Sequence, residues 1–112
     1  MSELFTIQLL ERSGTPLLLL GGELTTDGET PLVDTVQSVL SGPGEKIVFD
    51  FGHVKYINSG GISVLLSLIS RSRNSGKAIV FCGLSKHLRK VIEIVGMTDF
   101  VTVCDVVDEA LP

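Results

Sequence analysis

The residues best placed to do chemistry are Asn58, Ser59, Gly60 and Gly61, which lie between an apolar run and an amphipathic helical pattern. A serine that begins a helix accepts a hydrogen bond from a free amide of the first turn, and Asn58 could cap the helix instead. Each glycine there disfavours the helix by about 1 kcal/mol relative to alanine. The pair therefore indicates a compensating role, which is to leave the Ser59 hydroxyl open to a partner.

A phosphate on Ser59 would suit this position, because free amides and the helix dipole both favour anions. The spacing alone also fits a simpler interpretation, in which Ser59 is only a cap and the glycines only relieve crowding near a strand. Neither GxGxxG nor a lysine-bearing P-loop is present, so the glycines do not form a nucleotide fingerprint.

Two further side chains lie just before the serine. Asp50 lies near the end of the apolar run over residues 46–51. It is predicted to stabilise the loop that follows by accepting amide hydrogen bonds. His53 lies in the same predicted loop, but no second acid is placed to orient it as a base toward Ser59. We therefore predict a protein that is not an enzyme, with no catalytic residue, no cofactor and no metal site.

Composition narrows the function classes. The 112 residues are 44% apolar and 20% charged with a net charge of −4, which predicts one folded domain over residues 1–112 and argues against nucleic-acid binding. No apolar run reaches the roughly 18 residues of a membrane span, so we expect a cytoplasmic protein without membrane contact. Cys82 and Cys104 lack metal-ligand spacing and are predicted to be reduced, buried thiols.

Hydrophobic periodicity and turn signals predict strands and helices in alternation. Strands are expected over residues 5–10, 17–20, 46–51, 78–82 and 100–103, and helices over 31–40, 62–73, 86–95 and, briefly, 105–111. This order predicts an α/β fold with a mixed central sheet of four to five strands and about four helices, mostly on one face. If the strand that ends at Glu23 and Thr25 and the strand that ends at Asp50 are parallel neighbours, their C-terminal ends gather with the serine loop into one partner surface.

Three segments resemble the STAS domains of anti-sigma factor antagonists. They are Gly22-Glu23-Leu24, the stretch from Ile47 to Leu66, and the stretch from Gly76 to Phe100. The family pattern Asp-Ser-Ser-Gly or Asp-Ser-Thr-Gly corresponds to Asn58-Ser59-Gly60-Gly61, so the phosphorylated position of the family falls on Ser59. An aspartate that often follows Gly-Glu-Leu is replaced by Thr25, with Asp27 two residues later.

The resemblance implies a STAS-like domain that works by partner switching. The unphosphorylated protein would bind an anti-sigma factor, itself a serine kinase, and would be released when Ser59 is phosphorylated; a serine phosphatase would reset it. The partner-binding residues implied are Glu23, Thr25, Asp27, Asn58, Ser59, Gly60, Gly61 and Ile62. The alternative is a STAS accessory or scaffold subunit of a transporter or of a stress-sensing complex. The sequence leaves the oligomeric state open.

Overall fold

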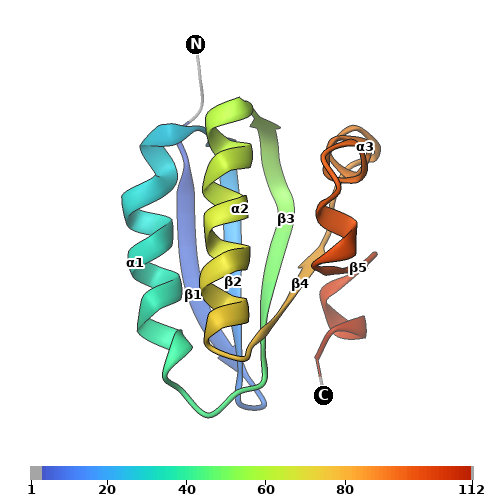
Figure 1. Cartoon of the computed structure of the whole chain (residues 1–112). Helices are drawn as coiled ribbons and strands as arrows, with labels where there is room; N and C mark the ends of the chain where they lie inside the picture. Colours follow the sequence, from blue (N-terminus) through green and yellow to red (C-terminus); the bar gives the residue numbers. More distant parts are fainter. Residues whose placement is uncertain (1–3, 112) are drawn as a thin grey trace.

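The computed structural model describes residues 4–111. Five strands form one sheet in the order β1-β2-β3-β4-β5 (Figure 1). They are β1 (Thr6–Arg12), β2 (Thr15–Leu24), β3 (Lys46–Ile57), β4 (Ala78–Cys82) and β5 (Thr102–Cys104). β1 and β2 form an antiparallel hairpin, and the remaining neighbours pair in parallel. The predicted hairpin and mixed sheet are confirmed.

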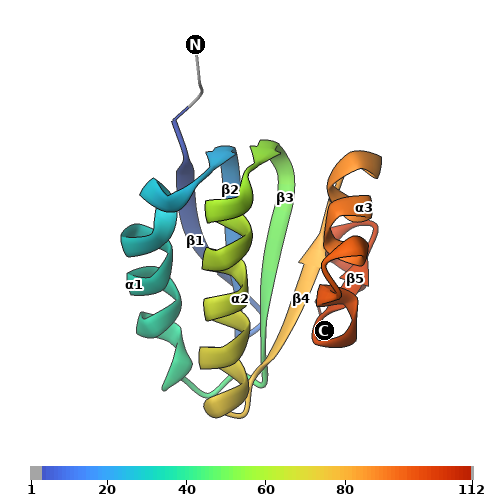
Figure 2. The same cartoon turned by 45° about the horizontal axis from the view of Figure 1, so that its top comes forward.

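Three α-helices connect the parallel strands: α1 (Glu29–Leu40), α2 (Ser59–Asn74) and α3 (Lys86–Ile94). Figures 1 and 2 show α1 and α2 side by side across β1 to β3, with α3 next to β4 and β5. Each helix buries one apolar face, through side chains such as Leu32, Leu65 and Leu88, against the same cluster of strand residues. The rings of Phe49, Phe51 and Phe81 pack together in this cluster, so all three helices share one core.

The end of the chain covers part of the opposite face of the sheet. Leu17, Val48 and Val80 are buried there beneath Ala110, with Leu111 packed beside them. The predicted terminal helix over 105–111 is instead a single 3-10 turn, η3 (Val107–Glu109). The α/β fold is as predicted, with three α-helices where about four were expected. None of the helices in the described part of the chain is long and apolar enough to cross a membrane.

Two strands extend beyond their predicted ends, and this changes the surroundings of the candidate site. β2 continues through Gly21 and Gly22 to Leu24, and β3 continues from Phe51 to Ile57. The β2–β3 register shifts twice along this stretch, between the partners of Leu19 and Gly21 and between those of Gly22 and Glu23. Residues 52–57, predicted as a loop, are therefore irregular strand whose backbone pairs with β2.

Smaller differences concern the ends of elements. α1 begins at Glu29, so Pro31 lies inside its first turn rather than at its first position. β5 begins at Thr102, two residues later than predicted, because the 3-10 turn η2 (Met97–Asp99) and Phe100 precede it. α3 matches its prediction closely: the Ser85 hydroxyl accepts a hydrogen bond from the Leu88 amide at 3.1 Å, and Gly96, with φ of +80°, follows its end.

Candidate functional site

The end of β2 and the start of α2 meet at one edge of the sheet. Because β2 and β3 are parallel, Glu23 pairs with Tyr56 and Leu24 pairs with Ile57. The Asn58 amide donates a hydrogen bond to the Leu24 carbonyl at 3.2 Å. The chain after Leu24 forms the 3-10 turn η1 (Thr26–Gly28), which packs against α2. The predicted gathering of Glu23, Thr25 and the serine segment is therefore present.

Asn58, not Ser59, caps α2. Its backbone is extended, and its side-chain Oδ1 accepts a hydrogen bond from the Gly61 amide at 2.9 Å. Ser59 is the first helical residue and is exposed. Within residues 4–111 its hydroxyl has no hydrogen-bond partner, although its carbonyl accepts a bond from the Ser63 hydroxyl at 3.2 Å. The hydroxyl is thus free of the capping role that Asn58 fills.

Gly60 and Gly61 are explained by close packing. A Cβ on Gly61 would lie 2.2 Å from the Leu24 carbonyl oxygen and 2.9 Å from the Ile57 side chain. A Cβ on Gly60 would lie 2.2 Å from the Thr26 hydroxyl oxygen and 3.1 Å from its amide nitrogen. The glycines let the first turn of α2 rest directly on the end of β2, and Gly61 is buried there. The crowding interpretation accounts for both of them.

The surface around Ser59 includes two acidic residues that lie outside the motif formed by residues 58–61. The Thr25 hydroxyl accepts a hydrogen bond from the Asp27 amide at 3.2 Å and so caps η1. Asp27 is exposed and Glu23 is half-buried, which places two carboxylates on the segment that packs against the serine turn. Ile62 is half-buried and packs against the core at the edge of this surface.

Sequence reasoning missed two members of this surface, Tyr56 and Thr26. The Tyr56 side chain is 48% exposed at the end of β3, beside Glu23 on β2. Thr26 is the residue that Gly60 approaches. Tyr56 could have been found as an aromatic residue two positions before the cap. Thr26 had no such signal, because its proximity depends on the β2–β3 register.

Asp50 does not lie in the serine loop. It is within β3, paired with Leu19 and Cys82, and seven residues of strand separate it from the cap. Its Oδ1 does accept an amide hydrogen bond, from Gly52 at 2.8 Å. Gly83 packs closely against the same carboxylate, since a Cβ on Gly83 would lie 2.7 Å from this oxygen. Asp50 therefore supports the first irregularity of β3 rather than the turn that carries Ser59.

His53 is also distant from the serine. It lies in β3 beside Gly21, four residues before the end of the strand. At about 3.3 Å per residue, those four residues span roughly 13 Å. The structure thus gives His53 no position as a base for Ser59. In the part of the chain that the structure describes, no three His, Cys, Asp or Glu side chains gather as a metal site.

The two cysteines are free and lie side by side in register on β4 and β5. Cys82 is fully buried as predicted, whereas Cys104 is only half-buried. Burial, followed by the neighbouring Cys104 and Asp50, raises the pKa of the Cys82 thiol from 9.0 to about 12. Cys82 is therefore protonated at neutral pH and is a poor nucleophile.

With this geometry established, comparison with known proteins identifies the family. The family model described as "Mlab, STAS domain" matches residues 7–104 of this chain, which is nearly all of the described sheet and helices. The chain belongs to the STAS domain family. The resemblance drawn from the serine segment and its flanking motifs is confirmed.

Individual relatives include both regulators and a transporter-family protein. A putative anti-sigma factor antagonist, BtrV of Bordetella bronchiseptica, is 37% identical over 51 residues, which are 46% of this chain and 44% of that protein. The match thus spans less than half the length of this curated relative. The phosphorylated form of SpoIIAA from Bacillus shares the fold with a TM-score of 0.69 and 18% identity, covering 96% of both chains. A sulfate transporter family protein from Wolinella succinogenes shares it with a TM-score of 0.79 and 17% identity, over 91% of this chain and 85% of that one.

Proposed function

We propose that this protein is an anti-sigma factor antagonist that is switched by phosphorylation of Ser59. The observation that carries the proposal is the exposed Ser59 hydroxyl at the first position of α2, with the cap supplied by Asn58. Unphosphorylated, the protein binds an anti-sigma factor that is itself a serine kinase. Phosphorylation releases that partner, and a serine phosphatase restores the binding state. The switch operates in the cytoplasm, and catalysis belongs to the partners.

The position of Ser59 is compatible with a phosphate and with enzyme access. The first amides of a helix have no carbonyl partner within it, and here the Asn58 side chain satisfies only that of Gly61. The remaining amides and the helix dipole favour an anion. The fold therefore tolerates the modified serine without rearrangement. The phosphate instead changes the surface that a partner contacts at this edge of the sheet.

The neighbouring charges explain why the phosphate would release a partner. A phosphate adds about −1.5 to −2 charges at pH 7. Glu23 and Asp27 already place negative charge on the segment that packs against this turn. The partner surface is complementary to two carboxylates and a neutral hydroxyl. Once the phosphate is added, the serine turn no longer fits this surface in charge or in volume. The contact set comprises Glu23, Thr25, Asp27, Asn58, Ser59, Gly60, Gly61 and Ile62, with Tyr56 at its edge.

Two departures from the family pattern alter the details. Asn58 replaces the usual aspartate, yet it caps α2 through its side-chain oxygen as an aspartate would. Gly60 replaces the second hydroxyl residue, and a larger residue there would meet Thr26. Ser59 is therefore the one phosphoacceptor of this motif, and the lost carboxylate reduces the negative charge next to it.

The test is phosphate transfer from the kinase-type anti-sigma factor of the same genome with Mg-ATP, followed by intact-mass spectrometry. We expect one added phosphate, none on Ser59→Ala, and an unchanged rate on the matched control Ser63→Ala, which lies one turn along the same exposed face. Ser59→Asp should weaken binding of that anti-sigma factor about tenfold or more. Phosphate on Ser59→Ala, or undiminished binding by Ser59→Asp, would refute the proposal.

The second candidate is a STAS accessory or scaffold subunit of a transporter or stress-sensing complex. The fold match to the sulfate transporter family protein favours keeping it. In that role the domain would remain bound to a permease or ATPase whether or not Ser59 is modified. Co-purification of such a subunit with Ser59→Asp as efficiently as with the native chain would support this candidate over the first.

A further inference from the structure

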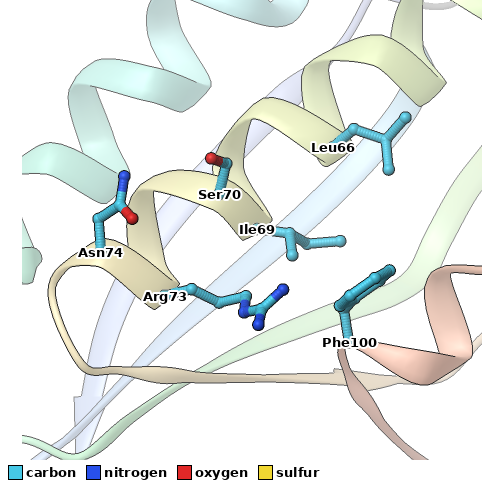
Figure 3. Close-up of a pocket in the computed structure, with 6 residues that line it drawn as sticks. All are labelled: Leu66, Ile69, Ser70, Arg73, Asn74 and Phe100. Carbon is cyan, nitrogen blue, oxygen red and sulfur yellow. The ribbon is translucent and has the colours of Figure 1, made fainter.

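A second surface lies at the other end of α2, away from Ser59. Figure 3 shows Leu66, Ile69 and Arg73 of α2 on the side of Phe100, which follows η2, and Ser70 and Asn74 projecting from the other side of the helix. Together they enclose an open hollow of about 390 Å³. The hollow lies between the second half of α2 and the segment that follows η2.

The walls of this hollow are large apolar side chains in contact with solvent. Leu66 is 43% exposed and Phe100 is 49% exposed, whereas Ile69 between them is buried and forms the floor. Single exposed apolar residues are ordinary, but here two of them share one concave surface, and concave surfaces with apolar walls are where ligands and partner side chains bind. Phenylalanine and arginine at such a centre are residue types enriched at protein interfaces.

Arg73 gives the hollow its charge. The central guanidinium carbon lies 5.0 Å from the centre of the Phe100 ring, a cation–π arrangement that holds the side chain over the apolar wall. Among residues 4–111 the one ion pair joins Arg89 to Asp105 at 3.0 Å, so Arg73, like the other basic side chains, has no carboxylate within ion-pair distance. Arg71 in the same helical turn instead reaches Gln37 on α1. In a chain of net charge −4, this groove presents an unneutralised cation.

We propose that this groove, formed by Leu66, Ile69, Ser70, Arg73, Asn74 and Phe100, docks an acidic amphipathic segment of a partner protein. One large apolar side chain of that segment fills the hollow against Leu66 and Phe100. A neighbouring carboxylate pairs with the Arg73 guanidinium, whose planar fork donates two parallel hydrogen bonds to the carboxylate oxygens. The polar edge formed by Ser70 and Asn74 offers hydrogen bonds to the backbone of the docked segment.

The groove is separate from the proposed phosphorylation switch. Arg73 follows Ser59 by fourteen residues, which at 1.5 Å per residue is about 21 Å along the helix. The Debye length at physiological salt is about 8 Å. A charge added at Ser59 is therefore screened before it reaches Arg73, and a partner docked here stays bound in either state of the switch. This inference holds whether or not Ser59 is phosphorylated in the cell.

The test uses short random peptides displayed on phage, selected on the native chain and depleted on Arg73→Glu. The enriched peptides should carry Asp or Glu within one helical turn of Leu, Ile or Phe. A synthetic fluorescein-labelled copy of the most enriched peptide is then titrated by anisotropy. We expect Arg73→Glu and Phe100→Ala to weaken its binding at least about tenfold, and added salt to weaken it further.

Matched variants keep the result interpretable. Arg71→Glu makes the same charge change in the same turn of α2 and should leave the affinity within about twofold, as should Ser59→Asp. Replacing the peptide's acid by lysine should restore binding to Arg73→Glu. Circular dichroism confirms that each variant is folded.

Several outcomes would overturn the proposal. The proposal fails if no peptide is enriched, if Arg71→Glu and Arg73→Glu weaken peptide binding equally, or if Ser59→Asp loses peptide binding. Sedimentation showing a dimer that Phe100→Ala abolishes would also overturn it, because a second copy of the chain would then fill the groove.

Discussion

The Asn58 side chain accepts a hydrogen bond from the Gly61 amide at 2.9 Å, and this contact fixes where α2 begins. Because Asn58 is the cap, the neighbouring serine is moved inside the helix and its hydroxyl is left for other partners. Gly61 contributes to the same arrangement because, without a side chain, it leaves room for the Leu24 carbonyl. Cap and glycine together hold the turn that presents Ser59.

Removing the cap should destabilise the protein while leaving Ser59 in place. We expect Asn58→Ala to lower the free energy of unfolding by about 1 kcal/mol, because the Gly61 amide loses its acceptor. Asn58→Asp should keep the bond and match or exceed the native stability, since a carboxylate suits a helix N-terminus. Urea denaturation measures both. Asn74→Ala, at the exposed opposite end of α2, is the control; a loss as large as that of Asn58→Ala would contradict the capping role.

The two glycines should differ in their tolerance of alanine. In an open helix, Gly→Ala would stabilise by about 1 kcal/mol. At Gly61 the added Cβ meets the Leu24 backbone, which cannot rotate away, so we expect a net loss of about 1 to 3 kcal/mol. At Gly60 the closest contact is the hydroxyl of exposed Thr26, which can turn aside, so the loss should be smaller. Thermal unfolding gives the ranking, and a Gly61→Ala protein as stable as the native one would show that the strand end yields.

Local signals in the sequence were sufficient for some elements. Ser85 and Gly96 lie at the two ends of α3, and the apolar spacing of Leu88 and Ile92 gives its buried face. The serine segment was likewise predicted as the start of a helix. These predictions succeeded because caps, stops and helical periodicity depend on residues within one or two turns.

Other features depend on distant residues and could not be predicted in this way. Gly52 and His53 are two successive residues without apolar side chains, which breaks the alternation of a strand, and residues 52–57 were predicted as a loop; in the structure both residues are exposed. That segment is a strand only because the end of β2 pairs with it. The same pairing places Tyr56 beside Glu23 and separates Asp50 from Ser59. The sequence also left open whether Ser59 or Asn58 caps the helix, because both residue types cap helices well.

Lys77 has a structural role that its sequence position does not suggest. It is buried, and its Nζ donates hydrogen bonds to the carbonyls of Gly42, at 2.8 Å, and of Gly44. These bonds hold the connection between α1 and β3. We expect Lys77→Met to lower the free energy of unfolding by about 1 to 3 kcal/mol, because bonds from a charged donor are lost. Urea denaturation checks this against Lys90→Met on the exposed side of α3, and equal stabilities for the two variants would contradict it.

The buried thiol of Cys82 should make stability depend on alkaline pH. Its pKa is raised from 9.0 to about 12 in the folded protein, so between these values the unfolded chain releases a proton that the folded chain keeps. The stabilisation is complete below pH 9 and is lost as pH rises, by up to about 1.4 kcal/mol per pH unit. Urea denaturation at pH 8 and pH 10 should show a larger loss for the native chain than for Cys82→Ala, which lacks the thiol but keeps every other titrating group. The Cys104→Ala variant should keep most of the effect, because burial is the main cause of the raised pKa; identical pH dependence in native and Cys82→Ala proteins would mean that the thiol is accessible to water.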